Sequence, residues 1–482
     1  MMKHLGELLS GLDDILVYGS SERTVTSIEN DSRLCRQDSL FVAISGTTTD
    51  GHTFIDAAIA NGARTIVCEH LPSLQRPDCT YLRTNSARIA CARLAHAFYD
   101  QPSQSLRIIG VTGTNGKTTI SFLLKQMLEF TGEKIGLIGT TGNYIGQDYF
   151  PTNYTTPEAP ELAGLLAKMR DSGITTVVME VSSHALSMFR VLGIRFAAAL
   201  FTNLTHDHLD YHGTMESYAL AKKKLFDALP TDAIAVLNND SEYAQFLASD
   251  THSTVVFVGR TSLSHYSITS EDITSSTSVY SLNEIVITTP LVGRFNIDNS
   301  AACCAILLAS GYDGLTVQSA AKNAVGAPGR MERYSLPNGA TAIIDYAHTP
   351  DALEKALQTC REILPENGNL CVVFGCGGDR DTSKRSVMGS ISEQYADTVY
   401  LTNDNPRTES PEKIIEDIRS GMRTSAAVVT ITDRAAAIDT AITHSSIGDI
   451  ILIAGKGHET YQIVGTEKRY CSDKDEVMKY LK

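Results

Sequence analysis

Residues 111–119, with the sequence VTGTNGKTT, combine residue types and spacing that suit phosphate chemistry. They follow an apolar run at 106–111 and precede a helical pattern at 120–130. A strand, a glycine turn and a helix start in this order aim backbone N–H groups at one point, as a phosphate chain requires. Lys117 would reach the outer phosphates, and the Thr118 hydroxyl would ligate Mg²⁺. The loop is a variant of the standard pattern, whose first glycine falls at Val111. The alternative, a glycine-rich turn with a surface lysine, is disfavoured by the flanking elements.

Polar side chains also follow other apolar strands of this segment. Glu180 and Ser182 come directly after a strand predicted at 175–179. In an open α/β sheet, ligands bind beyond the carboxyl ends of the strands. Both residues are therefore expected at the ligand-binding edge.

A seven-residue stretch at 206–212, beyond the strand predicted at 196–201, contains three histidines and two aspartates. Mg²⁺ prefers oxygen ligands and takes few of them from protein. We therefore expect His208 to be the residue of this stretch that acts as a metal ligand. We expect His206, Asp210 and His212 to be mainly structural or solvent-facing.

Lys222, Lys223 and Lys224 lie on a helix predicted at 215–229. A lysine triplet is usually a solvated face. At helical spacing the three side chains point in different directions, so at most one can face a site.

Two further polar groups have competing interpretations. Ser32, Arg33 and the polar glycine loop at 45–52 could hold a diphosphate or a nucleobase, but a turn with its caps is the favoured interpretation. Asn296 and Asn299 share one helical face and could bind a purine edge or cap the helix.

The elements that position these residues alternate between strands and helices. Polar and apolar residues alternate at 255–289, as in antiparallel strands or hairpins. Beyond residue 327, four predicted strands each end in polar residues, which indicates a second parallel sheet with its own crevice. The predicted fold class is α/β with three domains, at 1–98, 99–327 and 328–482.

Composition limits the function further. A chain of 482 residues is too long to fold around a single hydrophobic core. Its net charge of −14 argues against a general nucleic-acid binder. The ten cysteines are too dilute for a disulfide framework, and no signal peptide or membrane span is found. A cytoplasmic protein with reduced cysteines is expected.

Taken together in order, these motifs resemble the Mur ligase family, and most closely its tripeptide-forming members. The resemblance covers nearly the whole chain, and the union of the motifs is far more specific than any one of them. The motifs stand at 31–33, 113–119, 155–158, 180–184, 201–213, 221–226, 293–296, 329–332, 345–351, 377–381, 404–407 and 455–459.

The resemblance implies a UDP-binding N-terminal domain, a central ATPase domain with a phosphate loop, and a Rossmann-like C-terminal domain. It implies that ATP, with Mg²⁺, converts the carboxylate of UDP-N-acetylmuramoyl-L-alanyl-D-glutamate into an acyl phosphate, which a diamino acid then attacks. ATP and these two substrates are the implied small-molecule partners, and the expected state is a monomer.

The family roles carry over to residues of this sequence. The implied catalytic residues are Lys117, Glu180, His208 and Lys222, and the implied metal ligands are Thr118, Glu180, His208 and Lys222, the last as a CO₂-derived carbamate. The implied ATP-binding residues are Gly113, Thr114, Asn115, Gly116, Lys117, Thr118, Thr119, Asn296, Arg330, Asp345 and His348. Residues implied for the UDP-dipeptide are Ser32, Arg33, Thr155, Thr156, Ser182 and Arg190. Residues implied for the amino acid are Arg380, Asp404, Asn405, Arg407, Gly455 and Glu459.

The motif at 404–407, D-N-P-R, accompanies meso-diaminopimelate in the family, whose second carboxylate Arg407 can bind bidentately. Two departures, His206 and Ser386, affect loop detail only. The alternatives are a lysine-adding or polyglutamate-adding relative, and a nucleotide-binding protein without turnover.

Overall fold

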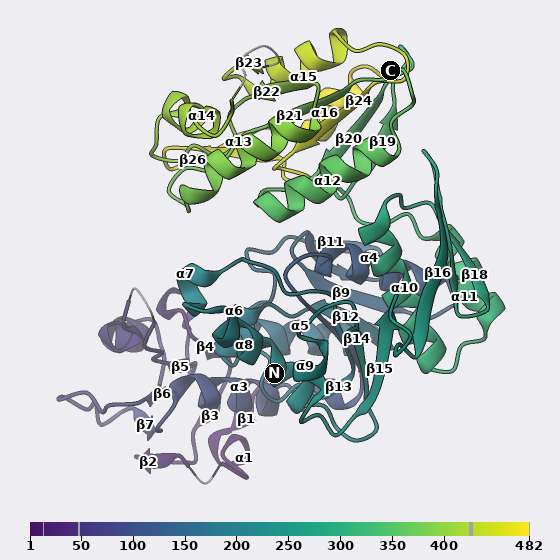
Figure 1. Cartoon of the computed structure of the whole chain (residues 1–482). Coiled ribbons are helices and arrows are strands. Elements are labelled where there is room, and N and C mark those ends of the chain that lie inside the picture. The colour runs from purple at the N-terminus through teal and green to yellow at the C-terminus, as the bar shows by residue number, and fades with distance from the viewer. Residues whose placement is uncertain (13, 47–48, 424–427, 482) are drawn as a thin grey trace.

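The computed structural model describes residues 1–12, 14–46, 49–423 and 428–481. Within these ranges, three large sheets follow one another along the chain. Figure 1 shows the N-terminal region in purple beside the central region, and the C-terminal region in green to yellow above it. The predicted α/β class is confirmed, whereas the domain boundaries stay predictions.

The N-terminal region is built on a five-stranded sheet of order β2-β7-β6-β5-β4, with β2 antiparallel to its neighbour. Its core packs helix α3 against buried strand residues such as Val42 and Leu82. Its elements are β1 (Lys3–His4), α1 (Leu5–Leu8), β2 (Leu16–Tyr18), β3 (Thr24–Val25), β4 (Ile28–Glu29), the 3₁₀ turn η1 (Ser32–Leu34), β5 (Leu40–Val42), η2 (Gly51–Phe54), α2 (Ile55–Ala60), β6 (Thr65–Cys68), β7 (Thr80–Arg83) and α3 (Ala87–Phe98).

The central region contains an eleven-stranded sheet of order β11-β10-β9-β12-β8-β13-β14-β15-β16-β17-β18. The strands from β9 to β16 in this order are parallel, and antiparallel strands extend both ends. Its elements are η3 (Pro102–Gln104), β8 (Arg107–Thr112), α4 (Lys117–Phe130), β9 (Ile135–Gly139), β10 (Gly142–Ile145), β11 (Asp148–Phe150), α5 (Ala159–Asp171), β12 (Thr176–Glu180), α6 (Ser183–Ser187), β13 (Phe196–Phe201), α7 (Leu209–His212), α8 (Met215–Asp227), β14 (Ile234–Asn238), α9 (Ala244–Ala248), β15 (Thr254–Gly259), β16 (Tyr266–Ile273), β17 (Ser278–Leu282), β18 (Ile285–Thr289), α10 (Arg294–Ala309) and α11 (Gly314–Asn323).

Register in this sheet brings the site together. Glu180 pairs with Val111, and Phe201 pairs with Thr112, so β8, β12 and β13 end at the same edge. Alternate residues of β8 enter different cores, with Ile109 packed on the α4 side and Ile108 on the α5 side. Burying each large aliphatic side chain stabilises this layered arrangement by about 1.5–3 kcal/mol.

The alternating pattern at 255–289 is only partly an antiparallel unit. Strands β16, β17 and β18 form the predicted hairpins, but β15 runs parallel to β14. A crossover through α9 joins β14 to β15, and such a connection produces parallel strands. The prediction of antiparallel pairing is therefore wrong for 254–259.

The C-terminal region contains the predicted second parallel sheet, of order β19-β20-β24-β21-β22-β23 with only β19 antiparallel. Buried apolar runs fill its strands, as expected for a sheet covered on both faces. Its elements are β19 (Glu332–Ser335), β20 (Thr341–Asp345), α12 (Pro350–Glu362), β21 (Leu370–Phe374), α13 (Ser383–Tyr395), β22 (Thr398–Leu401), α14 (Pro411–Arg419), β23 (Val428–Thr430), α15 (Arg434–Thr443), β24 (Ile450–Ala454), β25 (Tyr461–Val464), β26 (Glu467–Tyr470) and α16 (Asp473–Met478).

The state of the cysteines and the search for membrane-spanning helices can be compared with the expectations from composition. All ten cysteines are free; nine are buried and Cys471 is half-buried. None of the helices that the structure describes combines the length and apolarity that a membrane crossing needs.

Candidate functional site

The turn between β8 and α4 has the conformation that its glycines predict. Gly113 and Gly116 adopt φ values of 149° and 87°. A Cβ atom on Gly113 would lie 1.8 Å from Thr202 Oγ1, and one on Gly116 would lie 2.6 Å from Asn299 Oδ1. Val111, where the standard loop has a glycine, is a buried residue of β8. The strand therefore continues through that position, and the turn begins two residues later.

The loop is held by the residues that follow β13. Thr202 Oγ1 donates to the carbonyl of Asn115 at 2.6 Å, and Asn203 Oδ1 accepts from the Asn115 amide at 3.0 Å. The Thr114 hydroxyl lies 3.2 Å from the hydroxyl of Tyr218 on α8. These contacts fix the loop before any ligand binds, which is what preorganised phosphate binding requires.

Lys117 begins helix α4 and folds back over the loop. Its Nζ donates to the carbonyls of Gly113 at 2.9 Å and Thr114 at 2.8 Å. Burial lowers the pKa of Lys117, while the nearby Glu180 carboxylate acts in the opposite direction. Among the described residues Lys117 has no ion-pair partner, so its charge is available to an anion.

Glu180, the last residue of β12, is a buried carboxylate of the site and is only 1% exposed. Its Oε2 accepts from the hydroxyls of Thr118 at 3.0 Å and Thr140 at 3.1 Å, and its Oε1 accepts from the Thr140 amide at 2.9 Å. The Thr140 hydroxyl lies 3.0 Å from that of Thr155. Glu180 thus joins the start of α4 to the loops that follow β9 and β11.

The other residues predicted for the peptide substrate continue from this point. The Thr156 hydroxyl donates to the carbonyl of Glu180 at 2.8 Å and accepts from the Ser182 amide at 3.1 Å. Arg190 donates to the Thr156 carbonyl at 3.0 Å and forms an ion pair with Glu158 at 2.5 Å. The structure therefore brings Thr155, Thr156, Ser182 and Arg190 together beside Glu180.

The three lysines of α8 occupy three different environments. Lys222 is 1% exposed and donates to the Gly113 carbonyl at 2.9 Å, whereas Lys223 pairs with Asp227 and Asp250 at 2.6 and 2.7 Å. Lys224 is exposed. Burial, followed by the charge of Lys117, lowers the pKa of Lys222 well below its usual value. As predicted, one lysine faces the site.

The histidines after β13 form an aromatic group at the mouth of the site. His208 has a left-handed backbone, with φ 53°, and its ring lies 5.0 Å from that of His184. His212 stacks on Tyr218 and shares a 2.9 Å hydrogen bond with Ser183, which fits the predicted structural role. His206 and Asp210 are exposed. Among the described residues, no group of three or more His, Cys, Asp or Glu side chains has the arrangement of a metal centre.

A cavity of about 250 Å³ collects these groups. Its walls come from the loop, from Glu180, His208 and Lys222, and from Tyr346 and His348 of the C-terminal region. It is therefore an interdomain cavity that combines three basic side chains, Lys117, Lys222 and Arg330, with two carboxylates, Glu180 and Asp207.

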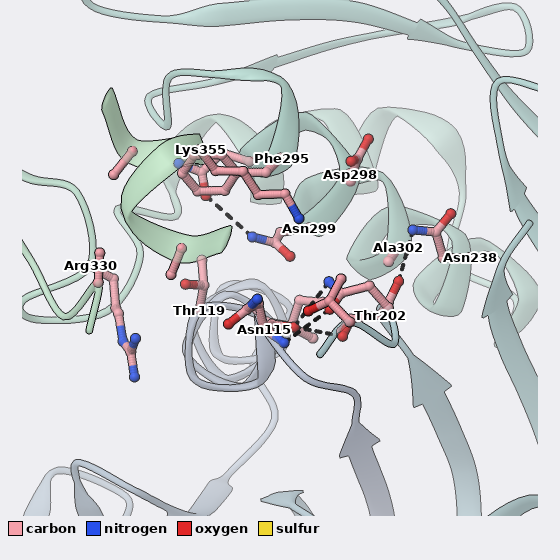
Figure 2. Close-up of a pocket in the computed structure, with 18 of the residues that line it drawn as sticks. Asn115, Thr119, Thr202, Asn238, Phe295, Asp298, Asn299, Ala302, Arg330 and Lys355 are labelled. Carbon is pink, nitrogen blue, oxygen red and sulfur yellow. Dashed lines mark hydrogen bonds between the residues drawn. The ribbon is translucent and has the colours of Figure 1, made fainter. Parts of the chain in front are cut away.

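A second cavity, of about 470 Å³, lies on the other side of the loop. Asn296 and Asn299 are buried there and are joined by a 3.3 Å hydrogen bond. Figure 2 shows Asn115 on one side of this cavity, with Phe295 and Lys355 on the other. Amide groups beside a flat ring and aliphatic chains suit a nucleobase.

Arg330 joins the two cavities, and Asp345 lines the larger one. Arg330 lines both, donates to the Thr118 hydroxyl at 3.3 Å and stacks on the Tyr346 ring at 4.5 Å. Asp345 accepts from the amides of Met331 and Ala347 at 2.8 Å. Burial raises the pKa of Asp345, and Arg330 opposes that shift.

A separate group of polar side chains, called the C-terminal crevice below after the prediction, lies where β22 and β24 end. Asn405 Nδ2 donates to Glu459 Oε2 at 3.3 Å, and Lys456, which is fully buried, pairs with Glu459 at 2.9 Å. Gly455 has φ 113°, and a Cβ on it would lie 2.8 Å from Asp404 Oδ2. Four of the residues predicted for the amino acid therefore lie together.

Arg407 borders this crevice with a left-handed backbone, φ 52°. Its guanidinium donates to the Gly378 carbonyl at 2.7 Å, and its amide donates to Ile463 of the β25–β26 hairpin at 3.0 Å. A Cβ on Gly377 would lie within 4 Å of the side chains of both Arg407 and Arg380. Arg380 thus stands beside the crevice, where it is exposed.

The N-terminal candidates fit the favoured interpretation of turns and caps. Asp31 accepts from the Arg33 amide and Asp50 from the His52 amide, each at the start of a 3₁₀ turn. Arg33 is exposed and pairs with Asp31 at 2.6 Å, whereas Ser32 is buried. Residues 47 and 48 of the polar loop lie outside the described residues. No hydrogen bond among the described residues joins Ser32 or Arg33 to the central site.

Three residues of the site were given no role from the sequence. Thr140 follows β9 at the same sheet edge, a position that could have flagged it. Asp351 accepts from the Asn115 side chain at 2.8 Å across 236 positions of sequence, and Lys456 is hidden within a glycine motif. Nothing in the local sequence distinguishes these two contacts from ordinary helix and loop chemistry.

Comparison with known families agrees with this geometry. The Mur ligase middle domain matches residues 111–307, the Mur ligase glutamate ligase domain matches residues 329–457, and the Mur ligase family catalytic domain matches residues 24–99. The three matches follow the order of the three sheets.

Curated relatives match over nearly the full chain. A UDP-N-acetylmuramoyl-L-alanyl-D-glutamate--2,6-diaminopimelate ligase of Phocaeicola vulgatus is 40% identical over 98% of both chains. Ligases of the same name from Chlorobaculum tepidum and Geobacillus thermodenitrificans are 43% and 42% identical, over 94% and 96% of this chain and 91% and 96% of their own.

Solved structures agree as well. One described as a UDP-N-acetylmuramoyl-L-alanyl-D-glutamate--2,6-diaminopimelate ligase is 32% identical with a TM-score of 0.71, covering 100% of this chain and 99% of that chain. A folylpolyglutamate synthase of Mycobacterium tuberculosis, 20% identical with a TM-score of 0.63 over 76% and 92% of the two chains, shares the fold. On these matches, and with the phosphate loop and interdomain cavities in place, this chain belongs to the Mur ligase family.

Proposed function

We propose that this chain joins meso-2,6-diaminopimelate to UDP-N-acetylmuramoyl-L-alanyl-D-glutamate at the cost of ATP. One observation carries the proposal: Tyr346 lines both interdomain cavities, and its hydroxyl donates to Glu459 in the C-terminal crevice at 3.4 Å. A phosphate site and an amino-acid site thus meet at one side chain. The names of the relatives supply the identity of both substrates.

The chemistry follows from the low reactivity of a carboxylate. An oxygen of the D-glutamate carboxylate attacks the γ-phosphorus of ATP and releases ADP, which leaves an acyl phosphate. The amine of the second substrate attacks the acyl carbon, and the tetrahedral intermediate expels phosphate and loses a proton. The loop amides and Lys117 hold the phosphates in line for the first step and stabilise its charge.

The donor set fits Mg²⁺, the ion that the family implies. The Thr118 hydroxyl and the Glu180 carboxylate, 3.0 Å apart, are hard oxygen donors, and His208 lines the same cavity. Mg²⁺ bound there would neutralise charge on the phosphates during transfer. We assign Thr118, Glu180 and His208 to holding it.

Lys222 would contribute a further ligand as a carbamate. Its buried amine lacks any carboxylate partner among the described residues, and its lowered pKa favours the neutral form that attacks CO₂. Attack of the neutral amine on CO₂ forms an N–C bond and releases one proton, which turns the amine into an anionic oxygen ligand. Lys223, paired with two aspartates, stays an ammonium.

The positions of the cavities and polar clusters suggest which residues bind each substrate. In this proposal, the phosphates of ATP lie across Gly113, Thr114, Asn115, Gly116, Lys117, Thr118 and Thr119. Asn296 contacts the adenine, Arg330 the phosphates and Asp345 the ribose, with His348 nearby. The UDP-dipeptide contacts Thr155, Thr156, Ser182 and Arg190, with Ser32 and Arg33 at its nucleotide end. The diamino acid contacts Asp404, Asn405, Gly455 and Glu459, with Arg407 and Arg380 on its distal carboxylate.

The proposed setting follows from these substrates. Every proposed contact comes from one chain, so a monomer is sufficient. UDP-linked peptides and ATP are soluble nucleotides, which supports a cytoplasmic reaction.

An amino-acid panel tests the proposal. ADP release is measured with the UDP-dipeptide and meso-diaminopimelate, L-lysine, L-ornithine or no amino acid. We expect release with meso-diaminopimelate to exceed the others by about 100-fold, because they lack the second carboxylate that Arg407 binds. Equal release with lysine, or with no amino acid, would refute the specificity.

A further inference from the structure

One side chain of helix α4 is bound to the segment that leads into the C-terminal region. Gln126 Oε1 accepts from the amides of Val325 at 2.7 Å and Gly326 at 3.3 Å, and its Nε2 donates to the Gly326 carbonyl at 3.0 Å. Residues 324–331, between α11 and β19, are called the linker below. A single amide side chain thus satisfies three backbone groups of the linker.

The same helix is contacted a second time from the linker. Arg330, four residues beyond Gly326, donates to the Thr118 hydroxyl at 3.3 Å. Positions 118 and 126 lie about 12 Å apart along a helix, and four residues of chain span at most about 14 Å. The linker therefore runs back along α4 from Gln126 toward the phosphate loop.

The linker in turn places residues of the nucleotide cavity. The Met331 amide donates to Asp345 at 2.8 Å, so the end of the linker is tied to the end of β20. Arg330 and Asp345 both line the larger interdomain cavity. A shift of the linker would move both residues relative to the phosphate loop.

Packing holds the linker only in part. Gln126, Gly326, Arg330 and Met331 border a third cavity, of about 460 Å³. Val325 is 73% exposed, although Ala327 is buried. A segment beside unfilled space lacks the close packing that fixes a core, so its hydrogen bonds have a larger share in setting its position.

We propose that Gln126 is a positioning residue for the nucleotide, acting through the linker on Arg330 and Asp345. It touches neither interdomain cavity itself, and nothing in its local sequence marks it. The inference rests on the proposed function in taking ATP as the nucleotide.

The test uses the full chain and a nucleotide that is not turned over. Binding of AMP-PNP is measured by calorimetry for the wild type, Gln126→Met, Gln126→Glu and a matched control, Gln147→Met. Gln147 also donates through its amide, to Glu129 at 3.1 Å, but lies far from the linker in sequence and makes no hydrogen bond to it among the described residues. Melting temperatures of all variants are recorded.

We expect Gln126→Met to weaken AMP-PNP binding by about 5- to 10-fold, with a matching rise in KM for ATP and little change in kcat. Gln126→Glu keeps the oxygen that binds the Val325 and Gly326 amides and should recover part of the loss. Gln147→Met should bind within about twofold of the wild type, since isolated surface changes have small effects.

A double-mutant cycle separates positioning from general destabilisation. If Gln126 acts through Arg330, then Gln126→Met should weaken binding by less than about twofold in an Arg330→Ala background. Fully multiplicative effects, or a lowered melting temperature with unchanged AMP-PNP affinity, would overturn the inference. Because AMP-PNP binding needs no ligation, failure of the amino-acid panel would leave this result standing, and the two ideas fail separately.

Discussion

The phosphate site and the C-terminal crevice treat their charges in opposite ways. Lys117 and Arg330 both line the phosphate site, and neither has an ion pair among the described residues. In the C-terminal region, Lys456 pairs with Glu459, and Arg385 pairs with both Glu409 and Asp417, at 2.8–2.9 Å. The phosphate site therefore offers unpaired cations, whereas the crevice combines the paired Lys456 and Glu459 with Arg407, which has no ion pair among the described residues.

This difference matches the ligands that we propose. A triphosphate brings several negative charges, and unpaired cations in a half-buried site stabilise it strongly. An amino acid with both ammonium and carboxylate groups brings little net charge, so its recognition depends on how fixed partners are arranged. We therefore expect charge to dominate the first site and geometry to dominate the second.

The largest effect is expected at Lys117. Lys117→Ala removes the cation beside the outer phosphates and should lower ADP release by about 10³-fold, the scale of losing a charged contact in phosphoryl transfer. Lys224→Ala, at an exposed lysine of α8, is the control and should leave turnover unchanged. Full activity of the Lys117 variant would mean that the loop is not a catalytic phosphate site.

Lys222 should rank next. Lys222→Ala is expected to lower turnover by about 100-fold, because an oxygen ligand for Mg²⁺ is lost, and short carboxylates should restore part of it. Lys223→Ala, which removes two ion pairs from the same helix, should keep its turnover. Wild-type activity should rise with added bicarbonate. If the two lysine variants behave alike, the carbamate assignment is wrong.

At Arg407 the effect should be confined to one substrate. Arg407→Ala should raise KM for meso-diaminopimelate by about 30- to 100-fold, the range for a lost bidentate carboxylate contact, with KM for ATP unchanged. Arg469→Ala, in the adjacent hairpin, should change neither constant, since Arg469 is exposed and pairs with Glu467. A parallel rise in both KM values would show that the crevice and the phosphate site are not separate.

The smallest effect concerns acid stability of the C-terminal region. Hydrogen bonds from Arg385 lower the pKa of Glu409 from 4.5 to about 2. The stabilisation is therefore fully present above pH 4.5 and is lost as pH falls toward 2. Glu409→Gln should melt a few degrees below the wild type at pH 7, and this gap should shrink from pH 4.5 downward. A gap independent of pH would contradict the assignment.

The sequence predicted features that depend on a few neighbouring residues, but not contacts between distant segments. The phosphate loop and Glu180 were predicted because a glycine turn and a strand end fix their geometry within a few residues. The pairing of Asn115 with Asp351 and of Gln126 with the linker depends on segments about 200 residues apart. No local pattern encodes such contacts, and the participation of Arg330, Asp345 and His348 was expected only from the family resemblance. β15 was assigned the wrong direction because alternation does not reveal strand orientation.

In the proposed reaction, phosphoryl transfer at the loop activates the carboxylate that the amine then attacks. It is tested most directly by labelling the D-glutamate side-chain carboxylate of the UDP-dipeptide with ¹⁸O and analysing the phosphate released in the presence of meso-diaminopimelate. We expect one ¹⁸O atom in each phosphate and one tripeptide formed per ADP. Unlabelled phosphate, or ADP without tripeptide, would contradict it.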